Sequence, residues 1–237
     1  QARREADAAV AVAVAAVNMG KPRKTKADAA LIQSALSGET KAVLVMLERF
    51  DIAACDAQGN HALGAAACGG HLELVQALCD RGAPLEQTND IGTTPLWLAS
   101  GYGHAAVLDY LLGKGADVNT PNNTKDTPML AAASKGHTEC AKRLVSAGAR
   151  HISLNSTGDS PLSLAVAAGN AELVRALAPL PGTAALVKRK NAKGVHPMAV
   201  AAAGGHVAVL EALLAAGGSL DERDANGATP LALAAFC

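Results

Sequence analysis

The pattern of apolar and polar residues in the middle of the chain predicts two short helices joined by a turn. Thr94-Pro95 opens the first helix, because the threonine can cap it and a proline suits the first helical position. His104 begins the second helix, whose apolar residues recur at helical spacing as far as Leu112. Gly115 then ends that helix, and residues 116–119 are expected to run extended into the next turn.

The same pattern recurs about every 33 residues. The proline of the helix start, or its equivalent, is separated from the next by 33, 33, 33, 36 and 33 residues. These positions are Ala62, Pro95, Pro128, Pro161, Pro197 and Pro230. A second series runs in step with them, as Gly70-His71, Gly103-His104, Gly136-His137, Gly169-Asn170 and Gly205-His206. A single helix pair cannot bury its own apolar faces, so the period predicts stacked units with a continuous core.

The fold class expected is therefore all-α, a solenoid of helix-turn-helix units with projecting hairpin-like loops, here called fingers. We divide the chain into an N-terminal helix and basic linker (1–26), an atypical capping repeat (27–56) and the remaining repeats (57–237), the last one cut short. The apolar run at 8–17 is interpreted as a helix that caps the stack. A remnant of a targeting segment, or a helix that docks elsewhere, is the alternative.

The quoted residues carry a family resemblance. Gly92-Thr93-Thr94-Pro95-Leu96, with Gly103-His104 and then Gly115-Ala116-Asp117-Val118-Asn119, resembles the ankyrin-repeat pattern, and the likeness extends from about residue 27 to 237. Departures from the pattern carry expectations of their own. Lys125 stands where other units have glycine, so Asn123 or Thr124 is expected to make the bend. Pro179 and Pro181 are expected to end a helix early and to distort the following finger.

Composition and charge narrow the function. The formal net charge is +0, which gives no electrostatic argument for nucleic acid or a membrane surface. No apolar run reaches the roughly 18 residues of a membrane span. The five scattered cysteines have no CxxC spacing, and we interpret them as buried thiols of an intracellular, reducing compartment. Because the last repeat stops inside its first helix, we expect the chain to continue in a longer protein or to lean on a partner.

The seven histidines do not predict a metal site or an enzyme. His71, His104, His137 and His206 occupy one repeat position, about 10 Å apart, which is too far to share a metal. His61 and His196 take the threonine position of the turn and are interpreted as structural. No catalytic motif accompanies them, so no catalytic residue, cofactor or metal is expected.

Partner-binding residues are expected on the finger tips and first helices, which line the concave binding face in the family that the chain resembles. This implication selects Asp90, Ile91, Trp97, Tyr102, Lys125 and Asp126. Tryptophan and tyrosine are enriched in binding hot spots. Trp97 has an alternative interpretation, which is packing between neighbouring first helices.

Two charge clusters lie on adjacent fingers. The basic cluster is Lys188, Arg189, Lys190 and Lys193, and the acidic one is Asp221, Glu222 and Asp224. The simplest expectation is that the opposite charges on the two adjacent fingers neutralise one another. The alternative is that the basic finger receives an acidic segment of a partner.

The function predicted is a non-catalytic scaffold or adaptor module that binds a partner protein on the concave face of an ankyrin solenoid. The alternative is a structural subunit, held permanently in a large assembly through its ends or convex side.

Overall fold

The computed structural model describes residues 26–191, 194–224 and 227–236. Its regular structure in these ranges is helical, with one isolated antiparallel bridge between Cys55 and His61. The chain forms two compact units, residues 1–123 and 124–237. The predicted N-terminal helix at 8–17 lies outside the described residues.

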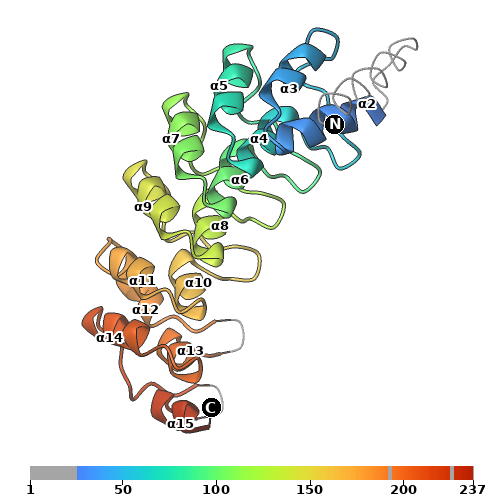
Figure 1. Cartoon of the computed structure of the whole chain (residues 1–237). Helices are drawn as coiled ribbons and strands as arrows, with labels where there is room; N and C mark the ends of the chain where they lie inside the picture. The colour runs from blue at the N-terminus through green and yellow to red at the C-terminus, as the bar shows by residue number, and fades with distance from the viewer. Residues whose placement is uncertain (1–25, 192–193, 225–226, 237) are drawn as a thin grey trace. The chain divides into compact units, whose positions relative to one another are not determined.

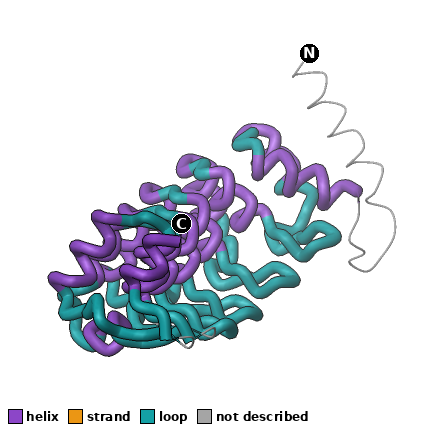
Figure 2. Tube along the Cα trace, turned by 90° about the horizontal axis from the view of Figure 1, so that it is seen from below, coloured by secondary structure: helices purple, strands orange, loops and turns teal. Residues whose placement is uncertain are grey.

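Unit 1 holds three helix pairs. They are α2 (Lys26–Leu36) with α3 (Thr40–Met46), α4 (Ala62–Gly69) with α5 (Leu72–Asp80), and α6 (Pro95–Tyr102) with α7 (Ala105–Gly113). The first helices pack in a row, α2 on α4 and α4 on α6, while α5 packs on α7 (Figure 1). Figure 2 shows the loops between repeats gathered on one side of the helices.

Unit 2 repeats the arrangement with one addition. Its helices are α8 (Pro128–Lys135), α9 (Thr138–Ser146), α10 (Pro161–Ala167), α11 (Ala171–Leu177), α12 (Thr183–Val187), α13 (Pro197–Ala203), α14 (Val207–Ala215) and α15 (Pro230–Phe236). The first helices again pack in sequence, α8 on α10, α10 on α13 and α13 on α15. The second helices α9, α11 and α14 form the other row. The stacked all-α architecture predicted from the period is confirmed.

Local chemistry fixes where the first helices begin. The Thr94 hydroxyl accepts a hydrogen bond from the Trp97 backbone N–H at 3.1 Å, and Pro95 takes the first helical position. Ser160 caps α10 more fully, because its side chain and that of Ser163 bond reciprocally to each other's backbone N–H. His61 makes no such cap, and its Nδ1 instead lies 3.2 Å from the Ala53 carbonyl.

The core lies between the two helix rows of each unit. In unit 1 the fully buried side chains include Leu31, Leu74, Leu96 and Leu108, one from each of four helices. Burying a leucine completely contributes about 1.5 to 3 kcal/mol. Because α2 packs on α4, α4 on α6 and α5 on α7, the apolar stripes also join each repeat to its neighbour and stabilise the stack.

Two expectations about the fingers change with the structure, and a third is confirmed. Lys125 itself takes the left-handed conformation, with φ 60°, so neither Asn123 nor Thr124 replaces the missing glycine. Val118 and Asn119 form a turn instead of an extended run, and the Asp117 carboxylate accepts from the Asn119 N–H at 2.9 Å. The early end of a helix at the prolines is confirmed, because α11 stops at Leu177.

The segment after those prolines is not merely a longer loop. Residues 183–187 form the one-turn helix α12, which packs on α10 and buries Leu186 and Val187. No pattern in the sequence predicted α12, because so short a helix is stable only when it packs on a neighbouring surface.

Hydrogen bonds join neighbouring fingers at their tips. In unit 1 the Asp90 N–H donates to the Gln58 carbonyl at 3.1 Å, and the Asn123 N–H donates to the Ile91 carbonyl at 3.1 Å. In unit 2 the Ser156 N–H donates to the Thr124 carbonyl at 2.9 Å. These bonds satisfy backbone groups that project from the helices and hold each finger against the next.

Among the helices of the described ranges, none has the length and apolar character needed to span a bilayer.

Candidate functional site

The finger tip at Asp90 and Ile91 presents an apolar side chain on a fixed backbone. Ile91 is 60% exposed, although its carbonyl is bonded to the next finger. The Asp90 carbonyl accepts from the Asn123 side-chain amide at 3.0 Å, and its carboxylate lies beside Gly59. Asp90 therefore shapes the tip, and both Asp90 and Ile91 are exposed to a partner.

Helix α6 carries the two aromatic candidates on different faces. Trp97 is half-buried and Tyr102 is 56% exposed. Five residues of an α-helix correspond to a rotation of about 500°, so the two side chains leave α6 roughly 140° apart. The sequence placed both in one repeat, and the helix separates them.

A thiol accompanies Tyr102, which the sequence analysis missed. Burial raises the pKa of the Cys68 thiol, and a hydrogen bond from the Tyr102 hydroxyl opposes that rise. In the other direction, the charge of Cys68 raises the pKa of Tyr102. Cys68 stands exactly one repeat before Gly101, so the 33-residue register could have placed it at the end of α4, beside Tyr102.

In unit 2 the finger tip at 124–126 is polar. Lys125 is exposed, and Asp126 is half-buried with its carboxylate accepting from the Thr124 hydroxyl at 3.1 Å. The left-handed backbone at Lys125 turns a long cationic side chain outward at a position where the equivalent residues are glycines.

The basic finger follows α12. Lys188, Arg189 and Lys190 are all exposed, and Lys193 lies outside the described residues. The expected neutralisation is wrong for these three side chains, since no ion pair within the described ranges joins them to the acidic cluster. Glu222 turns instead to His196, whose Nδ1 lies 3.0 Å from Oε2 of the carboxylate.

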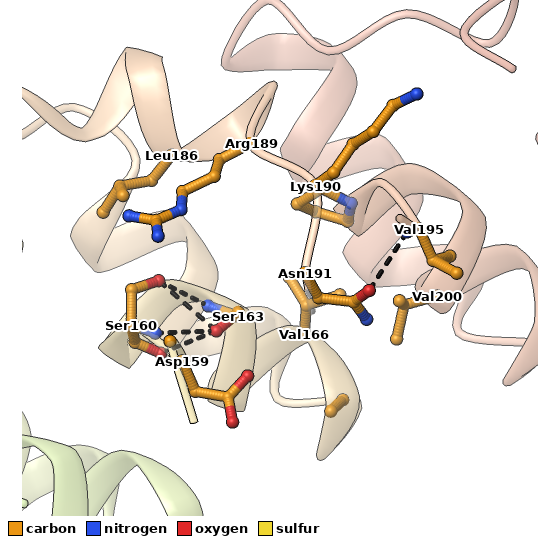
Figure 3. A pocket seen from close by; sticks show the side chains of 13 residues that line it. Asp159, Ser160, Ser163, Val166, Leu186, Arg189, Lys190, Asn191, Val195 and Val200 are labelled. Carbon is orange, nitrogen blue, oxygen red and sulfur yellow. Dashed lines mark hydrogen bonds between the residues drawn. The ribbon is translucent and has the colours of Figure 1, made fainter. Parts of the chain in front are cut away.

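A small hollow of about 70 Å³ lies under the basic finger in unit 2. Its polar lining comes from Arg189, Lys190, Asn191, Asp159 and the Ser160–Ser163 pair (Figure 3). Its apolar lining includes Val166, Leu186, Val195 and Val200. Sequence reasoning identified the cations but had no means of finding the hollow, because α12 forms one of its walls.

The repeat period and the capped helix pairs agree with the comparisons. The family described as "Ankyrin repeats (3 copies)" matches residues 31–122 and 114–190, more than half of the chain. The chain belongs to the ankyrin-repeat family. Among solved structures, the human ASB11 ankyrin repeat domain is 26% identical and superposes with a TM-score of 0.76, covering 86% of this chain and 90% of that one. No curated protein matches the chain. Ankyrin repeats are general protein–protein interaction modules and are typically non-catalytic.

The repeated histidines of this ankyrin stack hold adjacent repeats together. His71 Nε2 lies 2.8 Å from the Leu36 carbonyl, and His104 Nε2 lies 2.8 Å from the Cys68 carbonyl. Each ring therefore donates to the end of the preceding first helix, where unsatisfied carbonyls need donors. The structural interpretation is confirmed for both, with a partner in the neighbouring repeat. Within the described residues, no cluster of three His, Cys, Asp or Glu side chains could hold a metal ion.

Proposed function

We propose that this ankyrin-repeat chain is a non-catalytic module that binds a partner protein along the finger tips and first helices of unit 1. The observation that supports the proposal is the exposure of Ile91 on a tip whose backbone is already fixed at both ends. Exposed apolar side chains on a pre-organised backbone bind at low entropic cost, since little freedom remains to be lost.

The aromatic residues of α6 extend this surface. Tyr102 offers a large exposed ring beside the Cys68 thiol. Trp97 contributes its exposed edge from another face of the helix. The partner therefore contacts this repeat at separate points, Ile91 and Asp90 at the tip and the aromatic residues along α6. The polar tip at Lys125 and Asp126 in unit 2 is a separate candidate for partner contact.

The proposal is tested by comparing what the immobilised wild-type and variant chains retain from an extract, with the retained protein identified by mass spectrometry and then titrated. Ile91→Ala and Trp97→Ala are each expected to weaken the purified complex by about 2 kcal/mol, roughly thirtyfold in Kd. Gln76→Ala, an exposed change on the second helix α5, is the matched control and should bind as wild type.

A packing role for Trp97 has a different signature. Trp97 is the only tryptophan, so its fluorescence reports this position alone. An accessible Trp97 is quenched by iodide and shifts to the blue when the partner binds. Emission that iodide does not quench, together with a lowered melting temperature for Trp97→Ala, would remove Trp97 from the binding surface.

The alternative function, a structural subunit held through its convex side, is favoured by one observation in unit 2. Val207 and Leu214 are 65% and 42% exposed and stand seven residues apart on α14, so they share one helix face. Val207→Asp would abolish retention of a stoichiometric, salt-resistant partner if that face is the interface. It would leave retention unchanged if the finger side binds.

The state of the cysteines supports an intracellular, reducing environment as part of the proposal. Cys55, Cys68, Cys79 and Cys140 are all free thiols. A chain matured in an oxidising compartment tends to pair its cysteines. Localisation of a tagged chain, read together with the reactivity of its thiols in cell lysate, tests the assignment.

A further inference from the structure

The basic finger carries charge that the rest of the described chain leaves uncompensated. Lys188, Arg189 and Lys190 are exposed and enter no ion pair within residues 26–191, 194–224 and 227–236. In the following finger, the Glu222 side chain is mostly buried, with Oε2 3.0 Å from His196 Nδ1. A local excess of positive charge therefore faces solvent in a protein whose formal net charge is +0.

Arg189 differs from the two lysines in where it points. Figure 3 shows its guanidinium above Ser160, whereas the Lys190 amine points away from the serines. Both serine hydroxyls are occupied. That of Ser163 donates to the Ser160 carbonyl at 3.0 Å and accepts from the Ser160 N–H at 2.8 Å, and that of Ser160 accepts from the Ser163 N–H at 3.1 Å. The guanidinium has five N–H donors and no acceptor, and within the described residues no hydrogen bond or ion pair engages them, so these donors are open to an acceptor from outside.

The shape of the hollow limits that acceptor to a small group. A volume of about 70 Å³ holds a few waters or one short polar side chain. None of its lining residues is aromatic, so a nucleobase would find no stacking platform. Its apolar lining, with Val166 and Leu186, suits the methylene groups that precede a carboxylate.

Asp159 favours a single negative charge over a double one. Its carboxylate also lines the hollow, and Figure 3 shows it below the serine pair, opposite Arg189. One of its oxygens, Oδ2, accepts from the Thr157 hydroxyl at 2.7 Å, which holds it in place. A fixed like charge opposes a dianionic phosphate more strongly than a carboxylate.

We propose that the basic finger of unit 2 binds an acidic segment of a protein partner, with one aspartate or glutamate carboxylate entering the hollow and pairing with the Arg189 guanidinium. The pairing uses the planar fork of arginine, which matches both carboxylate oxygens at once. Lys188 and Lys190 attract neighbouring acidic residues of the same segment. This inference rests on the proposed function, and it adds a second site with a defined ligand chemistry.

The test uses the full chain and a fluorescein-labelled oligoglutamate peptide, with binding followed by fluorescence anisotropy. Saturable binding is expected, and Arg189→Ala should weaken it roughly tenfold or more, as the loss of a charge-assisted hydrogen-bonded pair does. Arg175→Ala is the matched control, because it removes the same charge from an exposed position on α11 in the same unit. Arg189 is exposed, so its removal should leave the circular dichroism spectrum and melting temperature unchanged.

Arg189→Lys separates the paired geometry from simple charge. It keeps the positive charge but loses the fork, so its binding should resemble that of Arg189→Ala. Wild-type affinity for Arg189→Lys, or equal losses for Arg189→Ala and Arg175→Ala, would overturn the proposal. A phosphoserine peptide that bound more tightly than oligoglutamate, and through Arg189, would overturn the choice of carboxylate.

The inference and the proposed function fail separately. No binding of oligoglutamate, with retention of a partner that still depends on Ile91 and Trp97, would remove the acidic-segment site and keep the module. Binding of oligoglutamate through Arg189, with no partner dependent on Ile91 or Trp97, would keep the acidic-segment site and reject the partner-binding surface of unit 1.

Discussion

The finger-tip position at Gly92, Lys125 and Gly158 allows backbone strain to be separated from steric contact. The three residues are spaced by 33, and all have positive φ, at 78°, 60° and 80°. Gly92→Ala and Gly158→Ala therefore impose the same left-handed conformation on an alanine. The two sites differ in their described surroundings, because a Cβ at Gly158 would meet no atom of residues 26–191, 194–224 and 227–236 within 4 Å. At Gly92 it would lie 2.5 Å from Asn123 Oδ1 and 2.9 Å from the Asn123 backbone nitrogen.

The magnitudes follow from these distances. A left-handed alanine costs about 1 to 2 kcal/mol, and the smaller freedom of the unfolded chain returns about 0.4 to 1 kcal/mol. Gly158→Ala should therefore destabilise the protein by about 1 kcal/mol. Gly92→Ala must also displace Asn123, which donates to the Ile91 carbonyl at 3.1 Å and to the Asp90 carbonyl at 3.0 Å. At about 1 kcal/mol for each hydrogen bond, the total cost should reach about 2 to 3 kcal/mol.

Urea denaturation followed by circular dichroism gives the two free energies. Because a repeat stack does not always unfold in one transition, hydrogen exchange of the Asn123 amide supplies a local measurement. Gly92→Ala should accelerate exchange at Asn123, whereas Gly158→Ala should leave it unchanged. Equal free-energy losses for the two variants, with no change in exchange at Asn123, would refute the argument that finger-to-finger contact sets the cost.

Three further changes test other parts of the structure. Lys125→Gly should stabilise the protein by about 0.5 to 1 kcal/mol, because glycine accepts a φ of 60° without strain. A lower free energy of unfolding in urea denaturation would contradict this. Tyr102→Phe removes the hydrogen bond that lowers the pKa of the Cys68 thiol. In a chain where Cys68 is the sole cysteine, it should therefore shift the pH–rate profile of alkylation to higher pH and slow the reaction at pH about 8, since the thiolate reacts; an unchanged profile would contradict the contact. Thr94→Ala should cost about 1 kcal/mol through loss of the α6 cap, and an unchanged urea midpoint would show that the cap is dispensable.

The repeat architecture was predictable because its signals are local and recur. A threonine that caps and a proline at the first helical position act within one turn, so the start of α6 at Pro95 could be derived without neighbours. The expectation at Lys125 failed for the opposite reason. Left-handed backbone is unfavourable for lysine by itself, but the following finger constrains the turn, as the bond from the Ser156 N–H to the Thr124 carbonyl shows. Tertiary hydrogen bonds there outweigh a local preference of about 1 to 2 kcal/mol.

For the candidate sites too, the sequence predicted which residues share a repeat or a finger, but not how their side chains lie in space. The sequence placed Trp97 and Tyr102 in one repeat, but only the helix shows that they leave it in different directions. It likewise placed opposite charges on adjacent fingers, where mutual neutralisation was the simplest expectation. Within the described residues Glu222 instead lies 3.0 Å from His196 Nδ1, an atom that is also 3.1 Å from the Lys188 carbonyl. Arg189 stands at the edge of a hollow that α12, formed after the prolines, helps to enclose. The inserted residues, whose fold the sequence did not predict, thus contribute to the feature of unit 2 that most resembles a binding site.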